Sequence, residues 1–333
     1  MINAFRRSPI FWPALGLVAL IALNVGFNPA FLQVTLLIGH LFGTPIDILL
    51  HGARPMLLAL GMTLVIATGG VDLSVGSVVA IAGAVCALLL QGGHSLALTL
   101  AAALGAGVVA GAINGVLVAR VGIQPIVATL ILMVAGRGIA QLLAGGQVLI
   151  IKNAAFDFLA NGYVLGLPMA PLLVTALFIA THVFLRRTAA GLFIEAVGDN
   201  ETASRFAGLA ARRVKLLAYV FCGACAGLAG ALYAANIGAA DGNRAGENAE
   251  LDAIFAVVVG GTALTGGRFV LAGSLLGALL IQTLTISMYN LGVPPAVAPV
   301  PKALLIVTVS LLQSEKLRGW FATRWRRGDQ APA

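Results

Sequence analysis

Apolar residues run through this chain in long uninterrupted blocks, separated by short loops that carry most of the charge. The longest block, from Leu73 to Ala119, contains 47 residues without one Asp, Glu, Lys or Arg. A helix needs about 20 apolar residues to cross the hydrocarbon core of a bilayer, so this block holds more than one crossing. Because backbone N–H and C=O groups in lipid must be hydrogen-bonded within the segment itself, the blocks are predicted to be helices.

The blocks predict an all-α fold, a polytopic membrane helix bundle formed by residues 1–333 as a single transmembrane domain. The second block is short, and only Gly69, Gly70 and Val71 join it to the third. It is either a full crossing or a broken helix whose bared backbone lines a cavity. Breaks at charges, Gly and Pro give about ten transmembrane helices (eight to ten): 10–27, 54–69, 72–91, 95–119, 123–144, 169–185, 216–237, 251–266, 269–290 and 300–313.

Basic residues fall mainly on one side of the membrane when the N-terminus is placed in the cytoplasm. With alternating crossings, 15 of the 20 Lys and Arg residues then lie in cytoplasmic loops, as the positive-inside rule requires. The outer side of the membrane is assigned Arg54, Lys152 and Arg244, and Lys302 is expected near that side. Both termini are therefore expected in the cytoplasm. The first block exceeds the roughly 7–15 residues of a signal-peptide core, so we expect a retained span.

Composition supports the membrane assignment. The mean hydropathy is +1.01 and only 10% of the residues are charged, against about 25% in soluble domains, which excludes a soluble fold. The formal charge of +8 reflects cytoplasmic loops, so no nucleic-acid partner is expected. Cys86, Cys222 and Cys225 all lie in apolar segments, which disfavours a disulfide framework. The four histidines show no metal-ligand spacing, and neither a metal site nor a cofactor is predicted.

Small residues are concentrated in the apolar blocks, and two of their clusters resemble each other. Gly and Ala crowd 105–111 and 223–230, which favours close helix packing. Residues 69–76 align without gaps on 260–267, each ahead of a run of small apolar residues. Gene duplication and chance similarity in a chain with 41 glycines both remain open as explanations.

A few polar residues fall inside the apolar blocks, where they are costly and often functional. Asp72 and Ser74 follow the Gly-Gly break, where the acid either caps the next helix or contacts a solute. Arg137 has no carboxylate within reach on its own helix, so it either faces a solute path or donates hydrogen bonds to carbonyls of another helix. Neutral groups suited to hydroxyls line a path or join helices: Asn114, Gln124, Thr129, Gln141, Asn236 and Gln282.

Motifs for covalent chemistry are missing from the sequence. No P-loop, H-E-x-x-H or G-x-S-x-G occurs, so neither nucleotide hydrolysis nor hydrolytic metal chemistry is expected. Proton or sodium coupling usually needs intramembrane carboxylates, and only Asp72 approaches that description. An ion-coupled carrier working alone is therefore the less favoured alternative, and a polytopic membrane enzyme is a third class.

The largest inner loop, 186–215, has the pattern of a partner-binding segment. Asn200 is predicted to cap a short helix that begins at Glu201, carries Arg205 near its negative end and ends at Gly208. This amphipathic helix either docks in a groove of a soluble partner, which we favour, or packs on lipid or on the chain itself. Its apolar side chains form one stripe: Ala203, Phe206 and Ala207.

Three segments resemble the sugar-type permease subunits of bacterial ABC importers, a family that includes ribose, galactose, xylose and galactofuranose permeases. They are GMTLVIATGGVDLSVG at 61–76, GDNETASR at 198–205 and ELDAI at 250–254, running on to Gly260 and Gly261. Two further segments are most similar to the galactofuranose permeases: LILMVAGRG at 130–138 and FIEAVG at 193–198.

The resemblance implies the membrane-spanning subunit of an ATP-driven importer in the bacterial inner membrane. It would move a monosaccharide such as galactofuranose by alternating access, without a cofactor or catalytic residues of its own. The implied partners are an ATP-binding subunit, a second permease subunit that is identical or similar, and a periplasmic sugar-binding protein that delivers sugar to outer loops such as 241–250. Residues expected along the translocation path are Asp72, Ser74, Asn114, Gln124, Arg137 and Gln141.

The same resemblance implies that the ATP-binding subunit docks on the cytoplasmic coupling loop 186–215. The loop departs from the general importer E-A-A pattern at Thr202 and in the longer gap that follows. Reversing the charge of Glu201 is expected to weaken docking, because this residue begins the docking helix. The residues expected to couple the spans to the ATPase are Glu195, Asn200, Glu201, Arg205 and Gly208.

Overall fold

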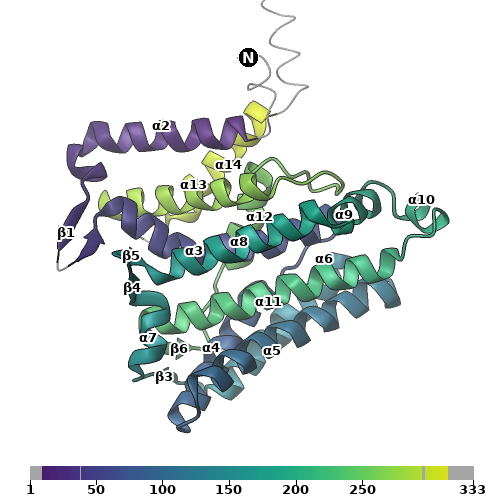
Figure 1. Cartoon of the computed structure of the whole chain (residues 1–333), viewed down its shortest axis with the longest axis horizontal. Coiled ribbons are helices and arrows are strands. Elements are labelled where there is room, and N and C mark those ends of the chain that lie inside the picture. Colours follow the sequence, from purple (N-terminus) through teal and green to yellow (C-terminus); the bar gives the residue numbers. More distant parts are fainter. Residues whose placement is uncertain (1–9, 38, 295–296, 314–333) are drawn as a thin grey trace, which may run out of the picture.

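The computed structural model describes residues 10–37, 39–294 and 297–313 (Figure 1). The prediction that both termini are cytoplasmic rests partly on basic residues outside these ranges. Those residues are Arg6, Arg7, Lys316, Arg318, Arg324, Arg326 and Arg327.

The described chain is a helix bundle in which every predicted apolar block contains a helix. Six helices are long and apolar enough to cross a membrane. They are α3 (Thr44–Ala67), α5 (Leu96–Val116, continued by a π turn at Leu117–Val121), α6 (Pro125–Leu143), α8 (Met169–Arg187), α11 (Ala211–Ile237) and α13 (Leu271–Asn290). Shorter helices fill the other four blocks: α2 (Phe11–Phe27), α4 (Val75–Gln91), α12 (Ala249–Val259) and α14 (Pro299–Gln313).

Short elements gather at the two ends of the long helices (Figure 1). One end, which we call the hairpin end, holds α7 (Ala154–Asn161) and three antiparallel strand pairs: β1 (Thr35–Leu37) with β2 (His40–Phe42), β3 (Val148–Ile150) with β6 (Ala239–Asp241), and β4 (Tyr163–Val164) with β5 (Leu167–Pro168). The opposite end, the α10 end, holds α9 (Ala190–Asp199) and α10 (Glu201–Phe206). The strands and α7 were not predicted, because they are too short to leave a periodic pattern.

Helix α3 begins ten residues earlier than the second predicted block and is long enough to cross. The sequence reading broke this block at Arg54 and Pro55, a charge beside a helix breaker. The helix nevertheless continues through Pro55, and its 16 buried residues pack inside the bundle. Packing against neighbours outweighs the backbone hydrogen bond that proline removes. The length of α3 favours the full-crossing alternative for this block.

The eighth predicted block, 251–266, does not form a full crossing. Helix α12 has 11 residues and ends at Val259, so it rises only about 16 Å, roughly half of the hydrocarbon core. The residues before it, 242–248, form turns rather than helix. The apolar composition of the block predicts a membrane-spanning helix. In the structure, however, the helix ends early, at Gly260 and Gly261. Helix α12 is therefore too short to cross by itself.

The two glycine breaks share a backbone geometry, in a register one residue away from the predicted alignment. Gly69 and Gly261 both adopt positive φ, 76° and 92°. Each of them and the residue after it donate to carbonyls three and five residues back, which is a Schellman C-cap. Since this cap requires the left-handed glycine, Gly69 corresponds to Gly261 and not to Gly260. The two breaks are also in contact. Gly267 N, in the connection after α12, donates a hydrogen bond to Ala67 O, at the end of α3, at 2.9 Å.

Helix α11 is the central element, packed against α3, α4 and α5. Its closest approach is to α5, where a Cβ added to Gly223 would lie 2.2 Å from Gly107 O and one added to Gly107 would lie 2.1 Å from Gly223 O. The two backbones therefore touch directly. Such close approach allows van der Waals packing to hold helices together in lipid, where the hydrophobic drive between helices is lost.

We expect Gly107→Ala to destabilise the purified protein by about 1–3 kcal/mol, because the added methyl group must push the α5 and α11 backbones apart. Thermal unfolding in detergent measures the effect. Gly105→Ala is the matched control, since it lies on the same helix with nothing within 4 Å of its added Cβ. Equal unfolding temperatures for the two variants would contradict this packing.

Candidate functional site

Asp72, Ser74 and Asn114 form a buried hydrogen-bonded cluster just before α4. Asp72 Oδ1 accepts from Ser74 N at 2.9 Å, from Ser74 Oγ at 2.6 Å and from Asn114 Nδ2 at 3.2 Å. Asn114 Nδ2 also donates to Ser74 Oγ at 2.8 Å. The preceding carbonyl, Val71 O, accepts from the Tyr219 hydroxyl at 3.2 Å. The cluster therefore ties the first break to α5 and α11 in packed protein, and its role in a path stays a prediction.

Gln124 and Gln141 lie at opposite ends of α6 and are exposed. Gln124 is the N-cap residue of this helix, but its side chain makes no capping hydrogen bond. The structure therefore brings neither glutamine to the Asp72 cluster. Their expected place along a path remains a prediction.

Arg137 donates hydrogen bonds to backbone carbonyls, one of the two alternatives that the sequence left open. Its Nη1 contacts the carbonyl oxygens of Ala245 at 2.6 Å, Asn243 at 3.3 Å and Gly242 at 3.4 Å. One side chain on α6 thus satisfies three carbonyls of the non-helical segment 242–248. Without such a donor these groups would be costly to bury.

The segment 242–248 descends into the bundle alongside α4. An added Cβ on Gly83 would lie 3.9 Å from Ala240 Cβ, whereas one on Gly76 would lie 2.3 Å from Gly246 O. Seven residues of helix separate the two glycines, a rise of about 10 Å. The sequence placed 241–250 among the outer loops, and this placement stays a prediction: Gly242 and Ala245 are buried, whereas Asn243, Arg244, Glu247 and Asn248 are exposed. Irregular backbone at this depth is tolerated where it is buried in protein or lines a cavity.

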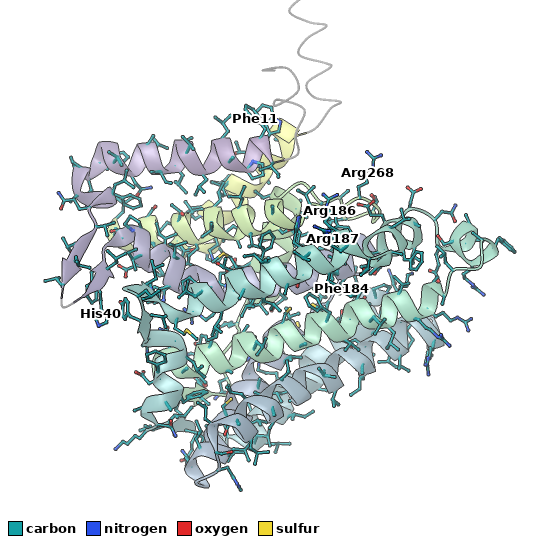
Figure 2. All side chains as sticks on the ribbon, viewed as in Figure 1. Phe11, His40, Phe184, Arg186, Arg187 and Arg268 are labelled. Carbon is teal, nitrogen blue, oxygen red and sulfur yellow. The ribbon has the colours of Figure 1, made fainter. Side chains whose placement is uncertain are left out.

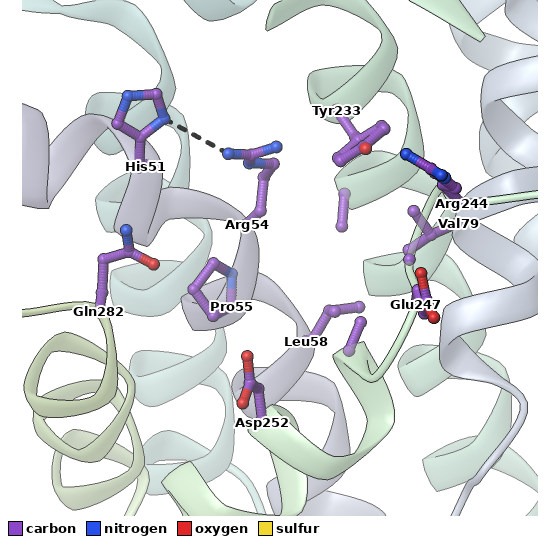
Figure 3. A pocket seen from close by; sticks show the side chains of 13 residues that line it. His51, Arg54, Pro55, Leu58, Val79, Tyr233, Arg244, Glu247, Asp252 and Gln282 are labelled. Atoms are coloured by element: carbon purple, nitrogen blue, oxygen red, sulfur yellow. Dashed lines mark hydrogen bonds between the residues drawn. The ribbon is translucent and has the colours of Figure 1, made fainter. Parts of the chain in front are cut away.

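A polar cavity of about 220 Å³ adjoins this segment (Figure 3). Arg54 lies within it, with Nη2 3.3 Å from His51 Nδ1 and its guanidinium carbon 5.1 Å from the centre of the Tyr233 ring. The other polar side chains come from segments distant in sequence. They are Arg244 and Glu247 from the irregular segment, Asp252 from α12 and Gln282 from α13.

The charges of the cavity are only partly paired. Asp252 accepts from Lys302 Nζ on α14 at 2.8 and 3.0 Å. In the described ranges there are two ion pairs, this one and a pair at the α10 end, and Arg54, Arg244 and Glu247 belong to neither. Arg244 and Glu247 are exposed, whereas Arg54 is partly buried.

Sequence reasoning missed most of this cavity. Of its polar lining only Gln282 was noted as a candidate, while Arg54 and Arg244 were used solely to assign sides of the membrane. The available signal was a set of charges at the edges of different apolar blocks. The sequence could not show that these charges face one another, since that depends on helix packing.

The predicted coupling helix forms as expected, and Glu195 lies apart from it. Asn200 Oδ1 accepts from Ala203 N at 2.9 Å, and Gly208 has a φ of 84°, which confirms the cap and the exit. Glu201 pairs with Lys215 at the start of α11. Reversing Glu201 would therefore break an internal ion pair as well as alter the surface. Glu195, on α9, lines a separate cavity of about 540 Å³.

Helix α9 ends against both glycine breaks. A Cβ added to Gly198 would lie 1.8 Å from Ala67 O and 2.5 Å from Gly267 N. The carbonyl that ends α3 thus contacts the α12–α13 connection and the end of α9 at one point. Displacement of α9 would therefore press on the end of α3, a helix that lines the polar cavity, and on the connection between α12 and α13.

We expect Lys302→Met to lower the thermal stability of the protein, because it leaves the half-buried Asp252 carboxylate unpaired. Asp252→Asn in the same chain is expected to restore part of the loss. A double-mutant cycle in detergent should give a coupling energy of about 0.5–3 kcal/mol. Additive effects of the two substitutions would show that the ion pair contributes nothing.

Comparison with known proteins gives one family and several long matches. Residues 44–310 match the family model described as branched-chain amino acid transport system, permease component. The galactofuranose transporter permease protein YtfT of Escherichia coli (strain K12) is 49% identical, covering 86% of this chain and 84% of that protein. No solved structure matches.

Two other relatives extend along nearly the whole chain. The fructose import permease protein FruF of Bifidobacterium longum (strain NCC 2705) is 36% identical, over 98% of this chain and 93% of that protein. The ribose import permease protein RbsC of Escherichia coli (strain K12) is 35% identical, over 91% of this chain and 92% of that protein. The similarity therefore includes the helices, both breaks and the irregular segment.

Proposed function

The chain belongs to the family of branched-chain amino acid transport system permease components, and from this premise we propose that it is the membrane-spanning subunit of an ATP-driven sugar importer. The observation that carries the proposal is that the irregular segment 242–248, which leads into the short helix α12, lines a polar cavity between the helices of the bundle. Transporters place solute sites at such interruptions, because the bared backbone and polar side chains replace water around the solute.

The solute we propose is a monosaccharide, with galactofuranose first. The three relatives described above are named for galactofuranose, fructose and ribose, and the galactofuranose permease is the most similar of the three. The family description instead names branched-chain amino acids. The relatives, which match over most of this chain, favour a sugar.

The α9–α10 segment is proposed to dock on the ATP-binding subunit. Helix α10 projects from the end of the bundle (Figure 1), and the Phe206 side chain is 88% exposed. An exposed aromatic residue on a capped helix suits insertion into a groove of a partner. The residues proposed for coupling remain Glu195, Asn200, Glu201, Arg205 and Gly208.

We place the α10 end in the cytoplasm of a bacterium and the bundle in its inner membrane. Arg186, Arg187 and Arg268 lie toward the α10 end, whereas His40 lies at the hairpin end (Figure 2), which agrees with the positive-inside rule. About ten membrane segments follow, one of them discontinuous, with both termini inside. The hairpin end would then receive sugar from a periplasmic binding protein.

A second permease subunit, identical or similar, is proposed to complete the path. Many large apolar side chains of α5, α6 and α8 are exposed in the single chain, and these faces are available to lipid or to a second subunit. The path itself would include the Asp72, Ser74 and Asn114 cluster together with Gln124, Arg137 and Gln141. Alternating access, driven by the ATPase, would move the solute.

Uptake into proteoliposomes tests the proposed function. The permease reconstituted with its ATP-binding subunit and sugar-binding protein is expected to accumulate galactofuranose only when ATP is supplied, because the permease sequence has no P-loop to hold the nucleotide. Uptake that survives removal of the ATPase and collapses with an uncoupler would identify an ion-coupled carrier. Accumulation of leucine but of no sugar would reject the sugar assignment.

Phe206→Ala is expected to weaken co-purification with the ATP-binding subunit by about tenfold or more, as loss of an aromatic anchor does at protein interfaces. Pull-down at matched expression measures the effect. Leu165→Ala is the matched control, since Leu165 is 99% exposed but lies at the hairpin end. Equal pull-down of wild type and the Phe206 variant would place the docking surface elsewhere.

A further inference from the structure

The polar cavity has the composition of a binding site for a polar solute. Its lining includes two guanidinium groups, Arg54 and Arg244, and two carboxylates, Glu247 and Asp252. Asp252 is already paired with Lys302, so the lining is left with one excess positive charge and is otherwise a set of hydrogen-bonding groups. A volume of about 220 Å³ far exceeds the roughly 10–15 Å³ that one water needs.

Hydrogen-bonding groups reach this cavity from several sides (Figure 3). Arg54 and Arg244 can only donate, Glu247 and Asp252 accept when ionised, and the Gln282 amide does both. A sugar hydroxyl both donates and accepts, so a ring of hydroxyls can use all three kinds of group. An apolar solute would desolvate groups such as the Arg54 guanidinium and the Gln282 amide without offering them hydrogen bonds, which costs free energy.

Tyr233 adds an apolar surface to the same cavity. The guanidinium carbon of Arg54 lies over its ring, 5.1 Å from the ring centre. Arg54 is also hydrogen-bonded to His51. A sugar ring has an apolar C–H face as well as hydroxyls, and an aromatic ring offers a matching flat surface. Arg54 can exchange its contact with the ring for hydrogen bonds to hydroxyls, because neither of its present partners is a carboxylate.

We propose that this cavity is a sugar-binding site of the permease itself, where Arg54, Gln282 and Asp252 hold the hydroxyls of a neutral monosaccharide beside Tyr233. This inference rests on the proposed function, since it names the place where the imported sugar is held. Selectivity then resides partly in the permease and not only in the binding protein that delivers the sugar.

Equilibrium binding of labelled D-galactofuranose, D-ribose or D-fructose to the detergent-solubilised permease–ATPase complex, without binding protein, tests the site. We expect saturable binding of at least one of these sugars by the wild type. Arg54→Met and Gln282→Leu should weaken it about tenfold or more, because each removes hydrogen-bonding groups while keeping a side chain of similar length. Lys152→Met is the control, since it removes an outer cation that does not line this cavity.

Co-purification with the ATPase shows that each variant has folded, and Arg54→Lys provides a second variant that keeps the charge but loses the planar fork. No saturable binding by the wild type, or equal binding by the Arg54 and Gln282 variants and the control, would overturn the inference. Tighter binding of the anion galacturonate than of the neutral sugars would overturn the neutral class.

The same complex in proteoliposomes separates this inference from the proposed function. ATP-driven sugar uptake by a complex that binds no sugar on its own would reject the cavity site and leave the importer function standing. No uptake of any of the three sugars, with binding protein and ATP present, would instead reject the sugar-importer function.

Discussion

Backbone hydrogen bonding at two interruptions of the helices is the constraint on which this bundle depends. An unpaired N–H or C=O group buried in an apolar environment costs several kcal/mol, yet the chain breaks helix at 68–74 and again at 242–248. At the first break Tyr219 donates to a freed carbonyl. At the second break, Arg137 donates hydrogen bonds to three backbone carbonyls. These two polar side chains thus have a structural role, and any role toward a solute must coexist with it.

The glycine contacts explain how interrupted segments can still be held rigidly. Helix α11 meets α5 backbone to backbone at Gly223 and Gly107, so the central helix and its neighbour form a close-packed pair. The end of α3 contacts Gly266 and Gly267 in the α12–α13 connection, and Gly198 brings α9 to the same point. Helix α9 thus lies in direct contact with the helix that carries Arg54 and with the connection that follows the helix that carries Asp252.

The two proposed functions, sugar binding and docking of the ATP-binding subunit, are assigned to different parts of the bundle. In the polar cavity, charged side chains of α3, α12 and the irregular segment lie together with Tyr233 of α11 and Gln282 of α13. At the α10 end, a capped helix with an exposed Phe206 faces outward. The family membership and the long matches to sugar permeases connect both features to one importer.

The sequence by itself determined the membrane location, the helical class and the approximate position of each apolar segment, because hydropathy and helix length are local properties. It also determined the cap at Asn200 and the exit at Gly208, since caps depend on a few neighbouring residues. Only the tertiary structure decided that α3 continues through Pro55 and that α12 is a half-length helix. Packing with other helices settles both, and hydropathy does not record it.

For the candidate functional residues too, the sequence identified some of the side chains and the tertiary structure identified their contacts. Asp72, Ser74 and Arg137 stood out from the sequence because each is polar within an apolar block. Their partners lie on other segments, Asn114 on α5 for Asp72 and Ser74 and the irregular segment for Arg137. Arg54, Tyr233 and Asp252 line one cavity from three different helices. These arrangements depend on how segments distant in sequence are placed side by side, which no local pattern encodes.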